Sequence, residues 1–263
     1  MSSQRIFAIV IRNLYMWPRT LERLMGSFGW PFFDLVIWGL TMTFIQKSLS
    51  AQFSLMTFIL GSLIFWTIVW RVQNDVSVNF LDEAWNKNLI NIFSSPLTPG
   101  EFLLAMIVLS LVKLCLTVIT LTVGAWILYQ FNFLKAFGFY IPVLIINLLL
   151  FGWAFGFLVN GFILRFGYTV SEFAWALIAF VQPFSCVFYP LSSLPSWAQK
   201  IGQILPTTYV FEEMRRILFS GQIEWKNLLI SFLLNILYLI LSLGFFQWMY
   251  ESAREHGRLV KLN

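Results

Sequence analysis

Residues 102–131 read FLLAMIVLSLVKLCLTVITLTVGAWILYQF, a run of 30 residues in which Lys113 carries the single charge. A helix of this length extends about 45 Å, whereas the hydrocarbon core of a bilayer is about 30 Å thick. The run is therefore too long for one perpendicular crossing. We infer that this helix starts in the cytoplasm or at the interface and crosses mainly from Leu114 onward.

The composition of the whole chain agrees with lipid as its main solvent. Apolar residues make up 59% of the 263 positions and charged residues 11%, whereas a soluble domain carries about 25% charged residues. The net charge of +5 is typical of basic residues that orient the chain in the membrane and contact anionic headgroups. The sequence shows no clustered basic face, so nucleic-acid binding is not expected. Cys115 and Cys186 lie in apolar runs and His256 in a polar tail, so no metal site or disulfide framework is expected.

Five further apolar segments complete an all-α integral membrane protein with six transmembrane helices. They are residues 30–45, 53–70, 139–164, 173–189 and 228–249. Arg71 is expected to close the second transmembrane helix, residues 53–70. The sequence thus predicts a six-span domain over residues 29–250, an N-terminal segment over 1–28 and a polar cytoplasmic tail over 251–263. No cleavable signal peptide is evident in the first 28 residues, so the first span is expected to act as the insertion signal.

The N-terminal segment has the pattern of an amphipathic interfacial helix. Arg5, Arg12 and Arg19 recur every seven residues and share one helical face, which Arg23 extends by one turn. Pro18 is expected to kink the segment. We expect residues 1–28 to lie on the cytoplasmic surface of the membrane.

The distribution of basic residues favours cytoplasmic termini. An even number of spans places both termini on one side, and putting them inside places ten Lys and Arg in the cytoplasm against six outside. We therefore expect a multi-pass protein of a bacterial or archaeal plasma (inner) membrane. No strong internal repeat is visible, which suggests that two chains pair to build a pathway.

A charged stretch between the second and third spans could carry mechanism. Residues 80–95 show helical spacing of apolar side chains, and Pro96 disfavours helical geometry just before it. Thr98 can cap the next helix, with Pro99 at its first position and Glu101 at its third. The short helix is either a rigid lever docked to a cytoplasmic partner or an ordinary interfacial helix resting on lipid.

A second stretch, residues 187–218, precedes the last span. Pro190, Pro195 and Pro206 cut it into pieces too short to cross. Residues 196–205 and 208–219 are helix candidates, the second capped by Thr207 or Thr208. Segments of this length are typical of re-entrant helices, so we expect outer half-helices over about 190–220, with a folded outer loop as the alternative.

Together the two stretches resemble those of type-2 ABC transporter permeases, the superfamily that exports polysaccharides, lipid-linked glycans and drugs. These permeases carry an acidic, leucine-bearing helix ending in a Ser-Pro-Leu turn, and a Leu-Pro…Pro-x-Tyr…Glu-x-x-Arg stretch before the last span. The matching residues are Glu83, Leu89, Ser95, Pro96, Leu97 and Glu101 in the first motif, and Leu194, Pro195, Pro206, Tyr209, Glu212 and Arg215 in the second. The resemblance covers the whole chain in span number, loop lengths and order. The chain departs from the family at residues 84–88, where an Arg-x-Gly-Thr is common.

The resemblance implies a role for each stretch. Residues 82–94 would be the coupling helix in a groove of the ATPase, and residues 190–220 the outer half-helices. The implied coupling residues are Asp82, Glu83, Leu89, Phe93, Ser95 and Pro96, and the implied half-helix residues are Pro195, Pro206, Tyr209, Glu212 and Arg215. The chain contains no Gly-x-x-x-x-Gly-Lys-Ser/Thr loop, so no cofactor is expected in this chain, and ATP and Mg²⁺ would bind a separate subunit. The expected partners are two ATPase copies, a second permease copy (a homodimer) and membrane lipids.

Polar and small residues inside the spans leave alternatives open. Gly152 and Gly156 form a GxxxG step that could pack helices within the chain or form a dimer seam. Asp34 and Lys113 are candidates for a transport role, although Asp34 could sit at a helix start and Lys113 could snorkel. Asn147 and Asn160 are expected to bridge helices by hydrogen bonds.

Three functions remain in competition. The first is a permease that exports an amphiphile. The second is a membrane-embedded enzyme acting on lipids, which would need converging catalytic groups that the spans do not supply. The third is a passive channel or scaffold, which would lack the cytoplasmic lever.

Overall fold

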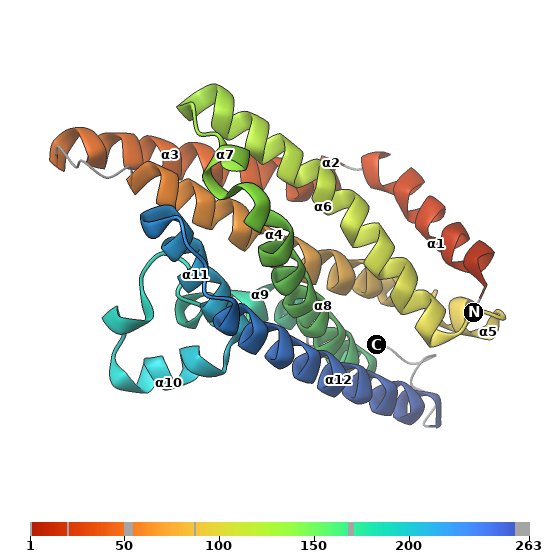
Figure 1. Cartoon of the computed structure of the whole chain (residues 1–263). Helices are drawn as coiled ribbons and strands as arrows, with labels where there is room; N and C mark the ends of the chain where they lie inside the picture. The colour runs from red at the N-terminus through yellow and green to blue at the C-terminus, as the bar shows by residue number, and fades with distance from the viewer. Residues whose placement is uncertain (1, 20, 50–54, 87, 168–170, 256–263) are drawn as a thin grey trace.

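The computed structural model describes residues 2–19, 21–49, 55–86, 88–167 and 171–255, and these residues form helices joined by turns, without a strand (Figure 1). Five helical stretches among them are long and apolar enough to cross a membrane. They are Met25–Lys47, Met56–Glu83, Pro99–Tyr129, Phe133–Phe166 and Trp225–Glu255. The predicted all-α membrane protein is confirmed.

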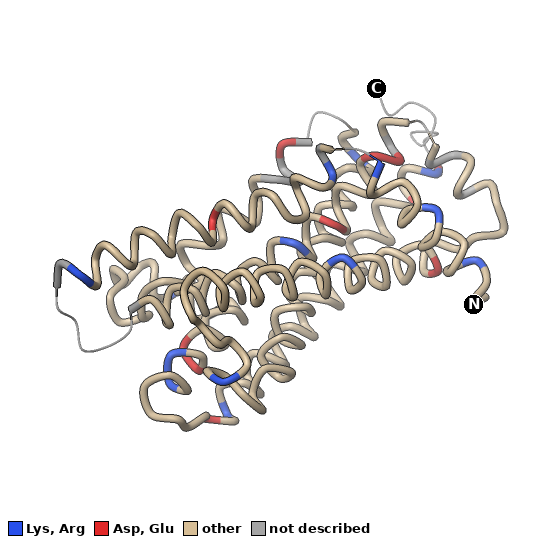
Figure 2. Tube along the Cα trace, turned by 90° about the horizontal axis from the view of Figure 1, so that it is seen from above, with Lys and Arg blue, Asp and Glu red and all other residues tan. Residues whose placement is uncertain are grey.

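Charged residues concentrate at the two ends of the long helices, with few between them (Figure 2). The start of α1 (Ser3–Met16), the short helix α5 (Leu89–Ser94) and the end of α12 (Trp225–Glu255) lie at one end of the bundle, here called the inner end (Figure 1). Helices α7 (Phe133–Phe137) and α10 (Ser196–Ile204) lie toward the opposite, outer end. This arrangement agrees with chain ends that share one side of a membrane.

The N-terminal segment is a helix of its own, as predicted, and packs along α6 (Pro99–Tyr129). Pro18 lies in a 3-10 turn, Trp17–Arg19, which ends the regular helix. After α2 (Leu21–Leu24), a π-helical turn, Met25–Gly29, leads directly into α3 (Trp30–Leu49). The predicted first span is thus found as α3, with the π-helical turn at its inner end.

The prediction that Arg71 closes the second span was wrong. Helix α4 (Leu55–Trp85) continues for 31 residues, well past Arg71. The guanidinium of Arg71 pairs with Asp75 one helical turn later, 2.8 Å away, and both side chains are buried. Because its charge is neutralised inside the protein, Arg71 does not have to reach the headgroup region. The first two residues of the predicted span, 53 and 54, lie outside the described residues.

The prediction of one coupling helix over residues 80–95 was also wrong in its extent. Asp82 and Glu83 belong to the last turns of α4, whereas Leu89 and Phe93 belong to α5. The amide of Asn88 still donates to the carbonyl of Glu83, 2.9 Å away, so the break between the two helices is tight. The predicted coupling segment therefore consists of the end of a long helix, α4, and a separate short helix, α5.

The start of α6 follows its sequence signal. The Thr98 hydroxyl accepts from the amide of Glu101 at 3.3 Å, and the Glu101 carboxylate accepts from the amide of Thr98 at 2.9 Å. Pro99 occupies the first helical position. The predicted capping box is confirmed.

Replacing Thr98 with alanine is expected to lower the free energy of unfolding by about 1 kcal/mol, because the backbone amide of Glu101 loses the hydroxyl that accepts from it at the start of α6. Thermal unfolding of the purified protein in detergent measures the effect. The matched control is Thr120→Ala, which removes an exposed hydroxyl bonded to the carbonyl of Leu116 within the same helix. Equal melting temperatures for the two variants would contradict the cap.

A single long helix over residues 173–189 was not found. The described structure there is α9 (Ser171–Val181), of 11 residues, followed by a 3-10 turn, Gln182–Phe184. Pro183 has no amide hydrogen to donate, and Cys186 has a positive φ of 55° that turns the chain. Whether α9 completes a sixth crossing stays a prediction.

The two outer half-helices are present as α10 and α11 (Pro206–Ser220), both too short to cross a bilayer. The predicted cap of the second was wrong, because α11 begins at Pro206 with Leu205 at the cap position. The hydroxyls of Thr207 and Thr208 bond instead to Ser185 Oγ at 2.8 Å and to the carbonyl of Phe184 at 3.2 Å. They fasten α11 to the turn that follows α9.

Helix α8 (Ile141–Phe166) is the centre of the bundle and packs against α4 and α12. A Cβ added at Gly152 would lie 2.9 Å from Val72 Cγ1, and one at Gly156 would lie 2.8 Å from Val76. The GxxxG step therefore packs helices within the chain. As predicted, asparagines bridge helices: Asn235 Nδ2 on α12 donates to the carbonyl of Asn147 at 2.9 Å.

Candidate functional site

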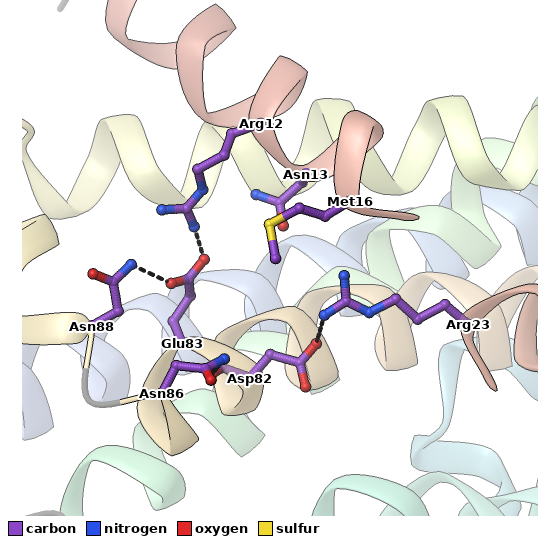
Figure 3. Close-up of a pocket in the computed structure, with 8 residues that line it drawn as sticks. All are labelled: Arg12, Asn13, Met16, Arg23, Asp82, Glu83, Asn86 and Asn88. Atoms are coloured by element: carbon purple, nitrogen blue, oxygen red, sulfur yellow. Dashed lines mark hydrogen bonds and ion pairs between the residues drawn. The ribbon is translucent and has the colours of Figure 1, made fainter. Parts of the chain in front are cut away.

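The arginines of the N-terminal segment meet the carboxylates at the inner end of the bundle. Arg12 forms an ion pair with Glu83, and Arg23 lies 2.8 Å from Asp82 (Figure 3). Arg5 pairs with Glu101 of α6 at 3.2 Å. Three arginines of the predicted face therefore contact carboxylates of two neighbouring helices, α4 and α6.

Glu83 is held from two sides. Arg12 approaches one carboxylate oxygen, and Asn88 Nδ2 donates to the other at 2.7 Å (Figure 3). Partial burial lowers the pKa of the Arg12 guanidinium, which nevertheless remains charged at neutral pH because arginine titrates so high. The pair fixes the last turn of α4 against α1 and against the residue that precedes α5.

Glu101 joins the start of α1 to the turn between α5 and α6. Its side chain is 1% exposed and accepts from the backbone amide of Ser2 at 2.7 Å as well as from Arg5. Arg5 also donates to the carbonyl of Pro96. The hydroxyl of Ser95 donates to the carbonyl of Ile92 at 2.6 Å and closes the end of α5. The Ser-Pro turn is thus fixed by contacts from two helices.

These contacts enclose a polar hollow of about 360 Å³ (Figure 3). Its lining consists of Arg12, Asn13, Met16, Arg23, Asp82, Glu83, Asn86 and Asn88. We call this group, together with the Arg5–Glu101 pair, the inner joint. Because opposite charges from α1, α4 and α6 pair across it, the inner joint can transmit a displacement of one helix to the others.

Of the predicted coupling residues, Asp82 and Glu83 lie in the inner joint, and the carbonyl of Pro96 accepts from Arg5, which also belongs to it. Leu89 and Phe93 lie on α5, but their side chains fall outside the described residues. The sequence interpretation missed the partners of Asp82 and Glu83, which are arginines of the same chain. The signal was present, since an arginine stripe and a set of carboxylates were both predicted at the cytoplasmic side.

The predicted outer residues also gather in one place. Glu212 accepts from the amide of Leu191 at 2.7 Å and pairs with Arg215 at 2.7 Å. Arg215 Nη1 donates to the carbonyl of Cys186 at 2.7 Å. These contacts hold α11 against the chain that enters from α9.

Other predicted outer residues shape the half-helices. Pro195 precedes α10, Pro206 begins α11, and the hydroxyl of Tyr209 donates to the carbonyl of Gln203 at 2.8 Å. Sequence reasoning missed the role of Glu213, which is fully buried and accepts from the amide of Glu224 at 2.7 Å. That bond joins the end of the half-helices to the start of α12.

The intramembrane charges that the sequence singled out differ in their surroundings. Asp34 is exposed on α3, whereas Lys113 is buried and lies 3.4 Å from Asp75. Lys113 therefore does not snorkel to the surface. Among the described residues, no group of three or more His, Cys, Asp or Glu side chains could hold a metal ion.

Comparison with known families agrees with this architecture. The sequence model of the ABC-2 type transporter family matches residues 5–219, which include α1, the inner joint and both half-helices. The match covers more than half of the chain, and the protein therefore belongs to the ABC-2 type transporter family, whose members are membrane components of ABC transporters. Membership implies a partnership with an ABC ATPase. A search of curated proteins found no match.

Proposed function

We propose that this chain is the permease subunit of an ATP-driven exporter that moves an amphiphilic or hydrophobic substrate out across the inner membrane. Two copies of the chain would assemble with two ATPase subunits, which bind ATP and Mg²⁺. The observation that carries the proposal is the inner joint, where the end of α4 is ion-paired to α1 and α2, and α1 is ion-paired to α6. A force applied at this end therefore reaches several membrane helices together.

The apolar surface of the long helices supports the proposed substrate class. The described part of α3 exposes large apolar and aromatic side chains along most of its length, and so does α12. Such surfaces suit an acyl chain, a lipid-linked glycan, a polysaccharide carried on a lipid, or a hydrophobic drug. ATP binding would bring the inner ends of two permeases together, and the substrate would leave between them.

Reversing the charges of Asp82 and Glu83 to arginine is expected to reduce ATP hydrolysis by the purified permease–ATPase complex in lipid nanodiscs. The reversed side chains would face Arg12 and Arg23 and would repel them, so the inner joint would open. The measurement is the difference between the hydrolysis rate of the complex and that of the isolated ATPase. We expect this difference to be about tenfold smaller for the variant than for the wild-type complex. Membrane insertion should be unchanged.

A charge exchange separates two ways in which these carboxylates could act. Adding Arg12→Glu and Arg23→Glu to the reversed variant restores opposite charges within the inner joint, so hydrolysis should recover. The matched control reverses Glu251 and Glu255, two exposed carboxylates near the inner end of α12. Unchanged hydrolysis in the Asp82 and Glu83 double variant would count against the proposed coupling, and failure of the exchange to rescue would assign the carboxylates to direct ATPase contact.

A further inference from the structure

A second polar group lies deeper in the bundle, where the π-helical turn Met25–Gly29 meets α4 and α6. Arg71 Nη1 donates to the carbonyl of Gly26 at 2.9 Å, and Arg71 Nη2 donates to Ser27 Oγ at 3.2 Å. From α6, the hydroxyl of Thr117 donates to the carbonyl of Ser27 at 3.1 Å. A π-helical turn leaves backbone groups outside the regular helical pattern and often marks a functional position. Here side chains of two other helices take up those groups.

The charges around this turn are almost fully buried. Arg71, Asp75 and Lys113 are 6%, 6% and 5% exposed. Arg71 Nη2 lies 2.8 and 3.0 Å from the two oxygens of Asp75, and Lys113 Nζ lies 3.4 Å from Asp75 Oδ1. One carboxylate thus compensates two cations that come from different helices. We call Arg71, Asp75 and Lys113 the buried ionic anchor.

The excess positive charge has uncharged partners nearby. Lys113 Nζ also lies 3.4 Å from Asn79 Oδ1 and 5.6 Å from the centre of the Trp17 ring. Trp17 Nε1 in turn donates to Ser27 Oγ at 2.8 Å. Amide oxygens and the face of an aromatic ring both stabilise a buried cation. These contacts extend the anchor to the N-terminal segment on the far side of the turn.

The two cations of the anchor differ in what they contact. The guanidinium of Arg71 is planar and has two terminal nitrogens that can bind different partners. Its Nη2 donates to Asp75, and its Nη1 donates to the carbonyl of Gly26 in the π-helical turn. Lys113 contacts Asp75, Asn79 and the Trp17 ring, none of which belongs to the turn. Arg71 is therefore the residue that joins α4 directly to the start of α3.

We propose that Arg71, held in place by Asp75, is a positioning residue that makes the π-helical turn and the start of α3 follow α4 when the ATPase acts on the inner end. This inference rests on the proposed function. A buried ion pair contributes little net stability, because desolvation offsets the attraction. Maintaining a fixed register between two moving helices is a role that such a pair can fill.

The chain offers a matched pair of variants. Arg71→Met and Lys113→Met each remove one of the two cations and each leave one cation facing Asp75, so the balance of buried charge changes equally. Only Arg71→Met removes the bonds to Gly26 and Ser27. A difference between the two variants therefore reports the contact with the turn, whereas an equal effect reports charge balance.

The test is hydrogen–deuterium exchange of the permease–ATPase complex in nanodiscs, with and without ATP and vanadate. In the wild-type protein, nucleotide should change exchange both at residues 82–94 and at residues 25–33. In Arg71→Met the response at 82–94 should persist, while the response at 25–33 should fall about tenfold. Lys113→Met should keep both responses. General destabilisation would raise exchange in residues 25–33 and in residues 82–94 alike, so it would not reproduce a loss confined to residues 25–33.

Each remaining outcome decides a different claim. A wild-type response confined to residues 82–94 would overturn the anchor and leave the proposed function standing, and it needs no variant that might misfold. Equal loss in Arg71→Met and Lys113→Met would overturn the assignment to Arg71. Absence of any response to nucleotide at residues 82–94 would overturn the proposed function itself, and with it the inference.

Discussion

Replacing Asp75 with asparagine is expected to lower the free energy of unfolding by about 3–5 kcal/mol, the range measured when one partner of a buried ion pair is removed. The substitution keeps the shape of the side chain but leaves Arg71 and Lys113 without a counter-charge. Both side chains are almost completely buried, so water cannot replace the carboxylate. Thermal unfolding in detergent, followed by size-exclusion chromatography, measures the loss.

A second substitution tests whether charge is the cause. Lys113→Met alone leaves the Arg71–Asp75 pair neutral and should cost much less than Asp75→Asn. Combining Lys113→Met with Asp75→Asn leaves one uncompensated cation in place of two, so part of the lost stability should return. If the double variant were no more stable than Asp75→Asn alone, repulsion between the two cations would not be the main cost.

Most of the helices could be predicted from local signals. The apolar runs around α3, α6, α8 and α12 are long enough to be recognised without any knowledge of their neighbours. The start of α6 was also predictable, because Thr98, Pro99 and Glu101 act within one helical turn of each other. Pro195 likewise indicated the start of α10, whereas α11 begins at Pro206 itself, two residues earlier than predicted.

The rest depends on partners that are distant in the sequence. Arg71 was interpreted as the end of a span, because a lone arginine after an apolar run usually reaches the headgroups. Its burial requires Asp75 on the same helix, the carbonyl of Gly26 and the hydroxyl of Ser27, the last two 45 and 44 positions earlier. No local pattern joins these segments, so neither the length of α4 nor the buried ionic anchor could be read from the sequence.

The candidate site shows the same limit. Asp82 and Glu83 were singled out from the sequence, and so were the arginines of the N-terminal segment, but they were not paired with one another. The pairing of Arg23 with Asp82 joins residues 59 positions apart. It arises because α1 packs along α6 and thereby places the arginine face over the end of α4. Contact with the ATPase remains a prediction for these carboxylates, which the chain already engages internally.

Adding a methyl group at both Gly152 and Gly156 is expected to destabilise the bundle by about 1–3 kcal/mol for each site, the usual effect of overpacking. The new Cβ atoms would lie 2.9 Å from Val72 Cγ1 and 2.8 Å from Val76 Cγ1. Valine on a helix has one strongly preferred rotamer, so neither side chain can swing away. Backbone lies behind them, since the carbonyl of Val69 is 3.2 Å from the Cβ position of Gly152. Helices α4 and α8 would have to separate.

The matched control is Gly244→Ala on α12, where a Cβ would meet no atom within 4 Å. That substitution should be neutral or slightly stabilising, because alanine loses less backbone freedom than glycine on folding. Adding Val76→Gly to Gly156→Ala should restore part of the stability, because it removes both Val76 atoms, Cβ and Cγ1, that the new methyl group would meet at 2.8 Å. Because α4 carries Arg71 and Asp75 of the buried ionic anchor as well as the carboxylates Asp82 and Glu83 of the inner joint, a separated α4–α8 contact should also weaken the response of residues 25–33 to nucleotide. If the Gly152 and Gly156 double variant had the same melting temperature as Gly244→Ala, the packing of α4 against α8 would not depend on this close approach.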